Sequence, residues 1–136
     1  MTTEARTEAS SDARPVRVLT VDDQVIFRQV ALDVINATPG FEPVGEACNG
    51  TEALDAVDRL APDLVLCDVR MPGLDGFEVA SRLAITHPST VVVLITIEDP
   101  MDLPADARRT TASLVVRKQD FGPRLLRHVW SDHAPA

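Results

Sequence analysis

The chain has 136 residues, of which 45% are apolar and 4% aromatic, and its formal net charge is -8. This length fits one ordinary domain with a mostly aliphatic core. The acidic balance argues against direct binding to nucleic acid and is compatible with a cationic partner or a metal. No stretch approaches the roughly 20 apolar residues that span a bilayer, and residues 1–14 lack the apolar core of a signal peptide. The sequence therefore predicts a soluble cytoplasmic protein without membrane association.

The expected elements follow one another in a regular order. Residues 1–14 are polar and predict a disordered tail. Apolar runs predict strands at 16–21, 42–48, 64–67, 91–95 and 114–116. Helical spacing of apolar residues predicts helices at 24–37, 51–60 and 75–86, a short helix at about 105–111, and a last helix that opens at 122–123.

Two features of these elements concern the core. In the helix 24–37, apolar side chains form two adjoining columns: Ile26, Val30 and Val34, and beside them Phe27, Ala31 and Ile35. Both cysteines, Cys48 and Cys67, fall in segments predicted as buried strands. That position is typical of reduced thiols and argues against a disulfide framework.

Five strand-then-helix units in succession predict an α/β fold. Such units join parallel strands through right-handed crossovers. We therefore expect a flavodoxin-like (βα)5 three-layer sandwich whose parallel sheet has the strand order 2-1-3-4-5. The ordered domain is expected to span residues 15–131, between the tail 1–14 and a short C-terminal tail, 132–136.

Polar side chains stand at the carboxyl ends of four predicted strands: Asp22 and Asp23, Asp68, Thr96 and Lys118. Each has an ordinary structural explanation taken alone, since an Asp pair often caps a helix, a Thr often fills a strand and a Lys is usually solvated. In the expected strand order, however, these four ends are neighbours, at the edge where open α/β sheets bind ligands. Their common location predicts one site.

This group of side chains suits phosphoryl transfer onto a carboxylate. Three carboxylates close together repel one another, which favours a divalent cation. Mg²⁺ binds through one or two carboxylates and takes phosphate oxygens as further ligands. With Asp68 as phosphoryl acceptor, Lys118 can offset the charge of one phosphoryl oxygen, and the Thr96 hydroxyl can donate a hydrogen bond to another.

At this point the chain resembles the receiver domain of bacterial two-component response regulators, in its single-domain form. The resemblance rests on Asp22-Asp23, the segment CDVRMPGLDG around Asp68, Thr96 at the end of an apolar strand, and Lys118. It implies that Asp68 accepts a phosphoryl group from a sensor histidine kinase or a phosphotransfer protein. It also implies that Thr96 and Lys118 contact that group and that contacts with a downstream protein change.

The resemblance further implies a Mg²⁺ site. Asp23 and Asp68 would bind the ion directly, Asp22 through water, and Arg70 through its backbone carbonyl. A chain of this kind is a monomer or a weak homodimer, and it catalyses only its own phosphorylation and dephosphorylation.

Three positions depart from the commonest pattern of the family. Val115 stands where an aromatic residue usually swings inward on activation, Ile97 follows Thr96 where a small residue is common, and Gln119 follows Lys118 where a proline with a cis bond is frequent. A cis bond before Gln119 is not expected, because it costs about 3–4 kcal/mol. These departures predict an unusual or weak conformational response to phosphorylation.

Two other functions stay open at this stage. A phosphatase with Asp68 as nucleophile would need a second acid two residues on, where this chain has Arg70. A degenerate receiver could instead act as a phosphorylation-independent scaffold, an alternative that Val115 and Ile97 favour. Finally, the resemblance implies that residues 70 and 98 flank the approach of water to the phosphoryl group. Arg70 and Glu98 carry opposite charges and can pair across the mouth of the site, where a closed pair would limit access of water. Two independent solvated side chains are the alternative.

Overall fold

The computed structural model describes residues 14–103 and 114–135. The helix predicted at about 105–111 and almost all of the predicted N-terminal tail lie outside the described residues. Within them the strands are β2 (Val16–Val21), β3 (Phe41–Ala47), β4 (Leu64–Asp68), β5 (Val91–Thr96) and β6 (Leu114–Arg117). The α-helices are α1 (Val25–Asn36), α2 (Gly50–Leu60), α3 (Gly76–Thr86) and α4 (Pro123–His133), with short 3-10 turns η2 (Pro100–Asp102) and η4 (Lys118–Asp120). No helix among these is long and apolar enough to cross a membrane.

All five strands pair in parallel, in the spatial order β3-β2-β4-β5-β6. Counted along the chain this is 2-1-3-4-5, so the predicted order is confirmed. The central strands β4 and β5 are buried along their whole length, which explains why both read as continuous apolar runs. The point where the order reverses lies between β2 and β4, and the ends of these two strands therefore form a crevice.

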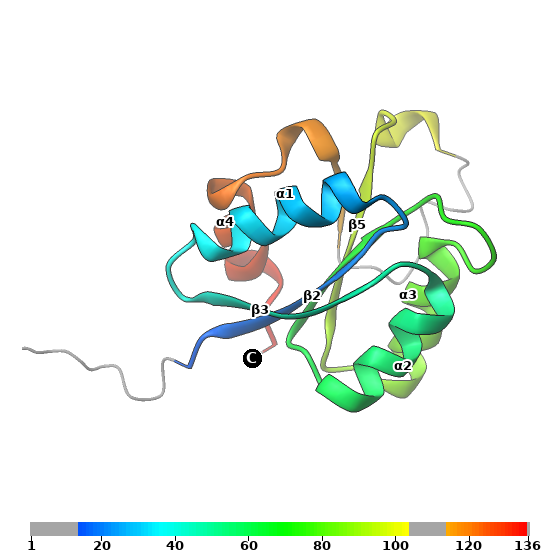
Figure 1. Ribbon diagram of the computed structural model, residues 1–136, viewed down its shortest axis with the longest axis horizontal. Coiled ribbons are helices and arrows are strands. Elements are labelled where there is room, and N and C mark those ends of the chain that lie inside the picture. The colour runs from blue at the N-terminus through cyan, green and yellow to red at the C-terminus, as the bar shows by residue number, and fades with distance from the viewer. Residues whose placement is uncertain (1–13, 104–113, 136) are drawn as a thin grey trace, which may run out of the picture.

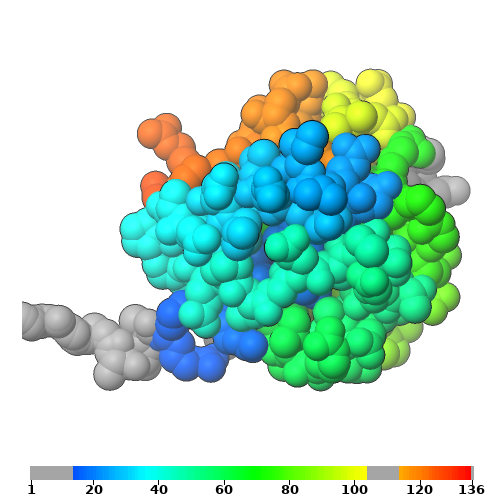
Figure 2. Space-filling view, in the orientation of Figure 1, coloured from blue at the N-terminus to red at the C-terminus, as the bar shows by residue number. Residues whose placement is uncertain are grey.

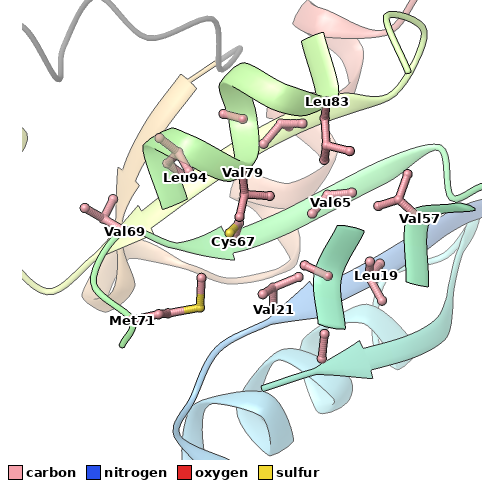
Figure 3. Close-up of a cluster of buried hydrophobic side chains, with 14 of the residues drawn as sticks. Leu19, Val21, Val57, Val65, Cys67, Val69, Met71, Val79, Leu83 and Leu94 are labelled. Carbon is pink, nitrogen blue, oxygen red and sulfur yellow. The ribbon is translucent and has the colours of Figure 1, made fainter. Parts of the chain in front are cut away.

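Helices cover both faces of the sheet, as Figure 1 shows. One layer of core joins α2 and α3 to the sheet through Val57, Val79 and Leu83, which meet strand residues such as Val65 and Leu94 (Figure 3). The other layer joins α1 and α4 to the opposite face and includes Ile35, Leu126 and Val129. Two apolar layers on one sheet make the three-layer sandwich that the sequence predicts.

The start of α3 fixes the loop that follows β4. Asp75 caps the helix by accepting from the backbone N–H of Glu78, and the Glu78 side chain accepts from the backbone N–H of Asp75. The first helical residue, Gly76, lies so close to β4 that a Cβ there would be 2.4 Å from the Asp68 backbone oxygen. Only glycine permits this approach, which holds the loop against the strand end.

The structure shows which column of α1 is buried and corrects one expectation about the cysteines. In α1, Ala31 and Ile35 are fully buried, whereas Ile26 is 78% exposed and Val30 43% exposed. A helix can turn only part of its circumference toward a sheet, and α1 turns the column that contains Ala31. Cys67 is buried as expected, but Cys48 is exposed because β3 ends one residue earlier and the chain turns there into α2.

Candidate functional site

The four predicted strand ends meet at one edge of the sheet. Asp22 and Asp23 follow β2, Asp68 ends β4, Thr96 ends β5, and Lys118 follows β6 as the first residue of η4. A cavity of about 420 Å³ opens between them. Its lining residues are Asp23, Gln24, Asp68, Arg70, Thr96, Ile97, Glu98 and Lys118. The structure therefore brings together the side chains that the sequence singled out, although Asp22 is fully buried and does not line the cavity.

Lys118 forms the charged centre of the site. Its Nζ lies 2.6 Å from Asp22 Oδ2 and 3.7 Å from Asp68 Oδ2, and its side chain is 14% exposed. In this state the ammonium is thus held closer to Asp22 than to Asp68. A lysine head is a compact charge on a flexible stem, so the ammonium can interact with either carboxylate.

The Asp22 carboxylate is held rigidly. It is fully buried, and its Oδ1 accepts a hydrogen bond of 2.8 Å from the backbone N–H of Gln24. The Asp22 backbone N–H donates to Ala47, and its carbonyl accepts from Arg28 at 2.8 Å. The Asp22 carboxylate is therefore held by a backbone N–H and by the Lys118 ammonium, on a backbone that is itself hydrogen-bonded on both sides.

The carboxyl group of Asp68 sits in an unfavourable electrostatic environment. Burial of the group and the neighbouring Asp22 carboxylate raise its pKa from 3.8 to about 6. The Lys118 ammonium and the backbone N–H of Arg70 lower that pKa and only partly offset the increase. Ionised Asp68 is thus destabilised relative to a solvated carboxylate, and a cation at the site would relieve that destabilisation.

The donor set fits a divalent cation. Carboxylate oxygens of Asp22, Asp23 and Asp68 lie within 4.8 Å of one another. Asp22 Oδ2 is buried, and no donor among the described residues reaches it in hydrogen-bonding geometry, although the Lys118 ammonium is an ion-pair neighbour. Asp23 is exposed toward the cavity and can reach an ion without losing a buried contact. Oxygen ligands in this arrangement are those that Mg²⁺ prefers.

Thr96 is a buried polar residue whose hydroxyl belongs to the site. It is 1% exposed, and its Oγ1 accepts a hydrogen bond of 3.0 Å from the backbone N–H of Glu98. The hydroxyl hydrogen remains for an acceptor on the cavity side. A side chain of this kind can donate to a phosphoryl oxygen without rearrangement of the strand.

Arg70 and Glu98 form the ion pair that the sequence suggested. Arg70 Nε lies 2.5 Å from Glu98 Oε1, and Nη2 lies 3.0 Å from Oε2, so the pair is bidentate. The hydrogen bonds from Arg70 hold the pKa of Glu98 below its usual value. Both residues line the cavity, and the pair links the loop after β4 to the loop after β5.

The three unusual positions have defined places. Val115 is partly buried and packs on the core layer below α2 and α3. Ile97 is 75% exposed and lines the cavity beside Thr96. The described residues contain no cis peptide bond, which confirms the expectation for Gln119.

Two aromatic residues lie beside the site, although the sequence pattern does not single them out. The Phe27 ring on α1 lies under Lys118, with 4.6 Å between Nζ and the ring centroid. Phe121, just after η4, packs against Phe27. Figure 2 shows α1 beside the segment between β6 and α4, which contains Phe121. In the sequence Phe27 is one apolar residue in a helical column, and its spacing carries no sign of a second role.

Comparison with known proteins agrees with this geometry. The family model for the response regulator receiver domain matches residues 18–129. A protein-glutamate methylesterase/protein-glutamine glutaminase of Myxococcus xanthus is 33% identical over 109 residues, which cover 80% of this chain and 31% of that protein. The positive alginate biosynthesis regulatory protein of Pseudomonas aeruginosa is 38% identical over 115 residues, covering 81% of this chain and 46% of that protein. The chain thus spans between about a third and a half of the length of these relatives.

Solved structures show the same architecture. The response regulator domain of Thermotoga maritima CheB has a TM-score of 0.77 and 28% identity, covering 90% of this chain and 100% of that one. The signal receiver domain of the response regulator NarL from Mycobacterium tuberculosis has a TM-score of 0.79 and 29% identity, covering 88% and 96%. With the family model matched over most of its length, this chain belongs to the response regulator receiver domain family.

Proposed function

We propose that this chain is a phosphorylation-dependent switch of a two-component system, with Asp68 as the phosphoryl acceptor. The observation that carries the proposal is the meeting of three carboxylates, a lysine and a buried hydroxyl at one cavity, formed by four strand ends. The receiver domain is proposed to span residues 15–131 and to act in the cytoplasm. Its activity is limited to its own phosphorylation and dephosphorylation.

Each residue has a defined part in the transfer. An electron pair of the Asp68 carboxylate forms the new O–P bond while the P–N bond to the donor imidazole breaks, and that bond's electron pair stays on the imidazole nitrogen. Lys118 and the Thr96 hydroxyl stabilise the charge on the phosphoryl oxygens. Asp22, Asp23, Asp68 and the backbone carbonyl of Arg70 would hold Mg²⁺, which supplies charge neutralisation when it is bound. In dephosphorylation, a separate step, water attacks phosphorus, the O–P bond to Asp68 breaks with its electron pair left on the carboxylate, and inorganic phosphate is released.

The proposed phosphoryl donor is a histidine-bearing protein, either a sensor kinase or a phosphotransfer protein. Such a donor has to approach the cavity closely, and the residues after Asp23 that enter α1 offer an apolar surface there. Val25 is 58% exposed and Ile26 78% exposed, far more than apolar side chains in a core. We propose that these side chains give the donor protein an apolar contact at the start of α1.

The phosphatase alternative loses support in the structure. The position two residues after Asp68 is occupied by Arg70, whose guanidinium donates two hydrogen bonds to Glu98 and does not release a proton to a leaving group at neutral pH. A phosphomonoesterase at this site would therefore have no general acid on the loop after β4.

Incubation with acetyl phosphate tests the proposal. We expect intact-mass analysis to show one added phosphoryl group in the presence of Mg²⁺, none with a chelator, and none on Asp68→Asn. Asp33→Asn, which alters an exposed carboxylate on α1, is the matched control and should be phosphorylated normally. An undiminished adduct on Asp68→Asn would exclude Asp68 as acceptor, and no adduct on the unmodified chain would favour the phosphorylation-independent scaffold.

A further inference from the structure

Lys118 has an aromatic neighbour, Phe27, that has no part in the reaction proposed above. Lys118 Nζ lies 4.6 Å from the centroid of the Phe27 ring, and it also pairs with the two carboxylates at 2.6 and 3.7 Å. At this distance the negative face of an aromatic ring attracts an ammonium ion. The ammonium therefore contacts both anionic oxygen and a π face.

The Phe27 ring is itself held in place. Its centroid lies 5.9 Å from that of Phe121, at an interplanar angle of 51°, a favourable tilted arrangement. Phe121 belongs to the same turn as Lys118, and its backbone N–H donates to the Lys118 carbonyl at 3.1 Å. Both rings also pack on the core layer under α1 and α4. The turn that begins at Lys118 thus contacts the Phe27 ring twice, through the Lys118 ammonium and through the Phe121 ring.

We infer that Phe27 is a positioning residue for the phosphoryl reaction, which acts through Lys118. The inference rests on the proposed function of Lys118. The ring face limits where the flexible lysine stem can place its head group, and it supplies attraction without occupying any of the three N–H donors. Lys118 can therefore shift from Asp22 toward a group on Asp68 while it stays over the ring. An aliphatic side chain of similar size would fill the same space and lack this attraction.

A series of fluorinated rings separates positioning from packing. Mono-, di- and trifluorinated phenylalanine at position 27 nearly preserve ring size but weaken the negative face step by step. The same trifluorinated residue at Phe41, which packs on the same core layer, is the matched control. Phe27→Leu gives the limit without an aromatic face, and urea unfolding verifies that each variant is folded.

Two readouts are needed. The first is the proton chemical shift of the Lys118 ε-methylene group in unphosphorylated protein, which moves toward the value of a solvated lysine as the ammonium leaves the ring face. The second is the rate of phosphorylation by acetyl phosphate at saturating Mg²⁺. Since a cation–π contact at a partly desolvated site is worth roughly a factor of three to ten in an equilibrium or rate, we expect the rate to fall by about that factor across the series. The logarithm of the rate should follow the weakening of the ring face, and the Phe41 control should change neither readout.

Unchanged methylene shifts and rates across the fluorinated series would overturn the inference, even if Phe27→Leu were slow, because the ring would then act by volume alone. If the unmodified chain takes up no phosphoryl group at Asp68, the proposed function fails instead, and the inference fails with it. These two failures are distinguished by the unmodified protein alone.

Discussion

Neutralising Asp68 should stabilise the metal-free protein, although Asp68 is the proposed reacting residue. In the folded chain its pKa is raised from 3.8 to about 6. The folded state therefore prefers the protonated form, and ionising the group costs folding free energy. A difference of this size between folded and unfolded states corresponds to at most about 3 kcal/mol. Because the carboxylate opens onto a solvent-filled cavity, screening reduces the expected effect to about 1–2 kcal/mol.

The pH dependence has a definite sign. Below the unfolded pKa of 3.8 the group is protonated in both states and contributes nothing to the difference. As pH rises from about 4 to 6 the unfolded state ionises first, so the wild-type protein loses stability, and the loss is complete above about pH 7. The gain in free energy of unfolding of Asp68→Asn over wild type should therefore reach its maximum by pH 7.5 and be about one third of that maximum at pH 4.5.

Urea unfolding in the presence of a chelator measures this effect. With a slope of about 2 kcal/mol per molar urea, we expect the Asp68→Asn midpoint to lie about 0.5–1 M above wild type at pH 7.5. The exposed carboxylate change Asp33→Asn is the control and should show no such gain. Mg²⁺ at ten times its dissociation constant should raise the free energy of unfolding of the wild type by about 1.4 kcal/mol, and that of Asp68→Asn by less. A destabilised Asp68→Asn, or a gain that is equal at both pH values, would refute the electrostatic reasoning.

Three further outcomes are expected. Calorimetric titration should show that Asp23→Ala lowers Mg²⁺ affinity more than Asp22→Ala, because the exposed Asp23 is the proposed direct ligand. Arg70→Ala and Glu98→Ala should each speed loss of the phosphoryl group, measured as release of inorganic phosphate. The double variant should be no faster than the faster single variant, because either change opens the same bidentate pair. Gly76→Ala should lower the free energy of unfolding by about 1–3 kcal/mol, because its Cβ would meet the backbone at the end of β4.

Each of these has its own contrary result. Equal losses of Mg²⁺ affinity would remove the distinction between direct and water-mediated ligands. Multiplicative rate effects of Arg70→Ala and Glu98→Ala would mean that the two side chains act separately. Gly122→Ala is the control for the glycine change, since nothing lies within 4 Å of a Cβ there, and equal destabilisation of both variants would contradict the close approach to β4.

The sheet and its polar edge were predictable because both depend on periodicity and on strand ends. Continuous apolar runs predicted β4 and β5 in the centre, and parallel connections then brought Asp68 and Lys118 to one edge. The pairing of Arg70 with Glu98 followed from the family resemblance, which placed both residues at the mouth of the site, together with their opposite charges. The predictions of the sheet and its edge use only position along a strand, which can be read from residue types and their order.

The sequence did not predict which face of a helix packs on the sheet, or which of two carboxylates lies nearer to Lys118. Helix α1 carries two adjoining apolar columns, and only packing against the sheet decides that Ile35 is buried while Ile26 is exposed. That Lys118 lies closer to Asp22 than to Asp68 depends on rotamers rather than residue type. The spacing of Phe27 in α1 indicates only a core residue, because its contact with Lys118 comes from η4, far along the chain.

Four strand ends are proposed to form one Mg²⁺-dependent phosphoryl site on Asp68. Calorimetric titration with beryllofluoride, which mimics a phosphoryl group on a carboxylate, probes that site without a kinase. We predict one equivalent bound to the wild-type chain with Mg²⁺ present, none with a chelator, and none to Asp68→Asn under either condition. Binding without Mg²⁺, equal binding to Asp68→Asn, or no binding to the wild-type chain would contradict the proposed site.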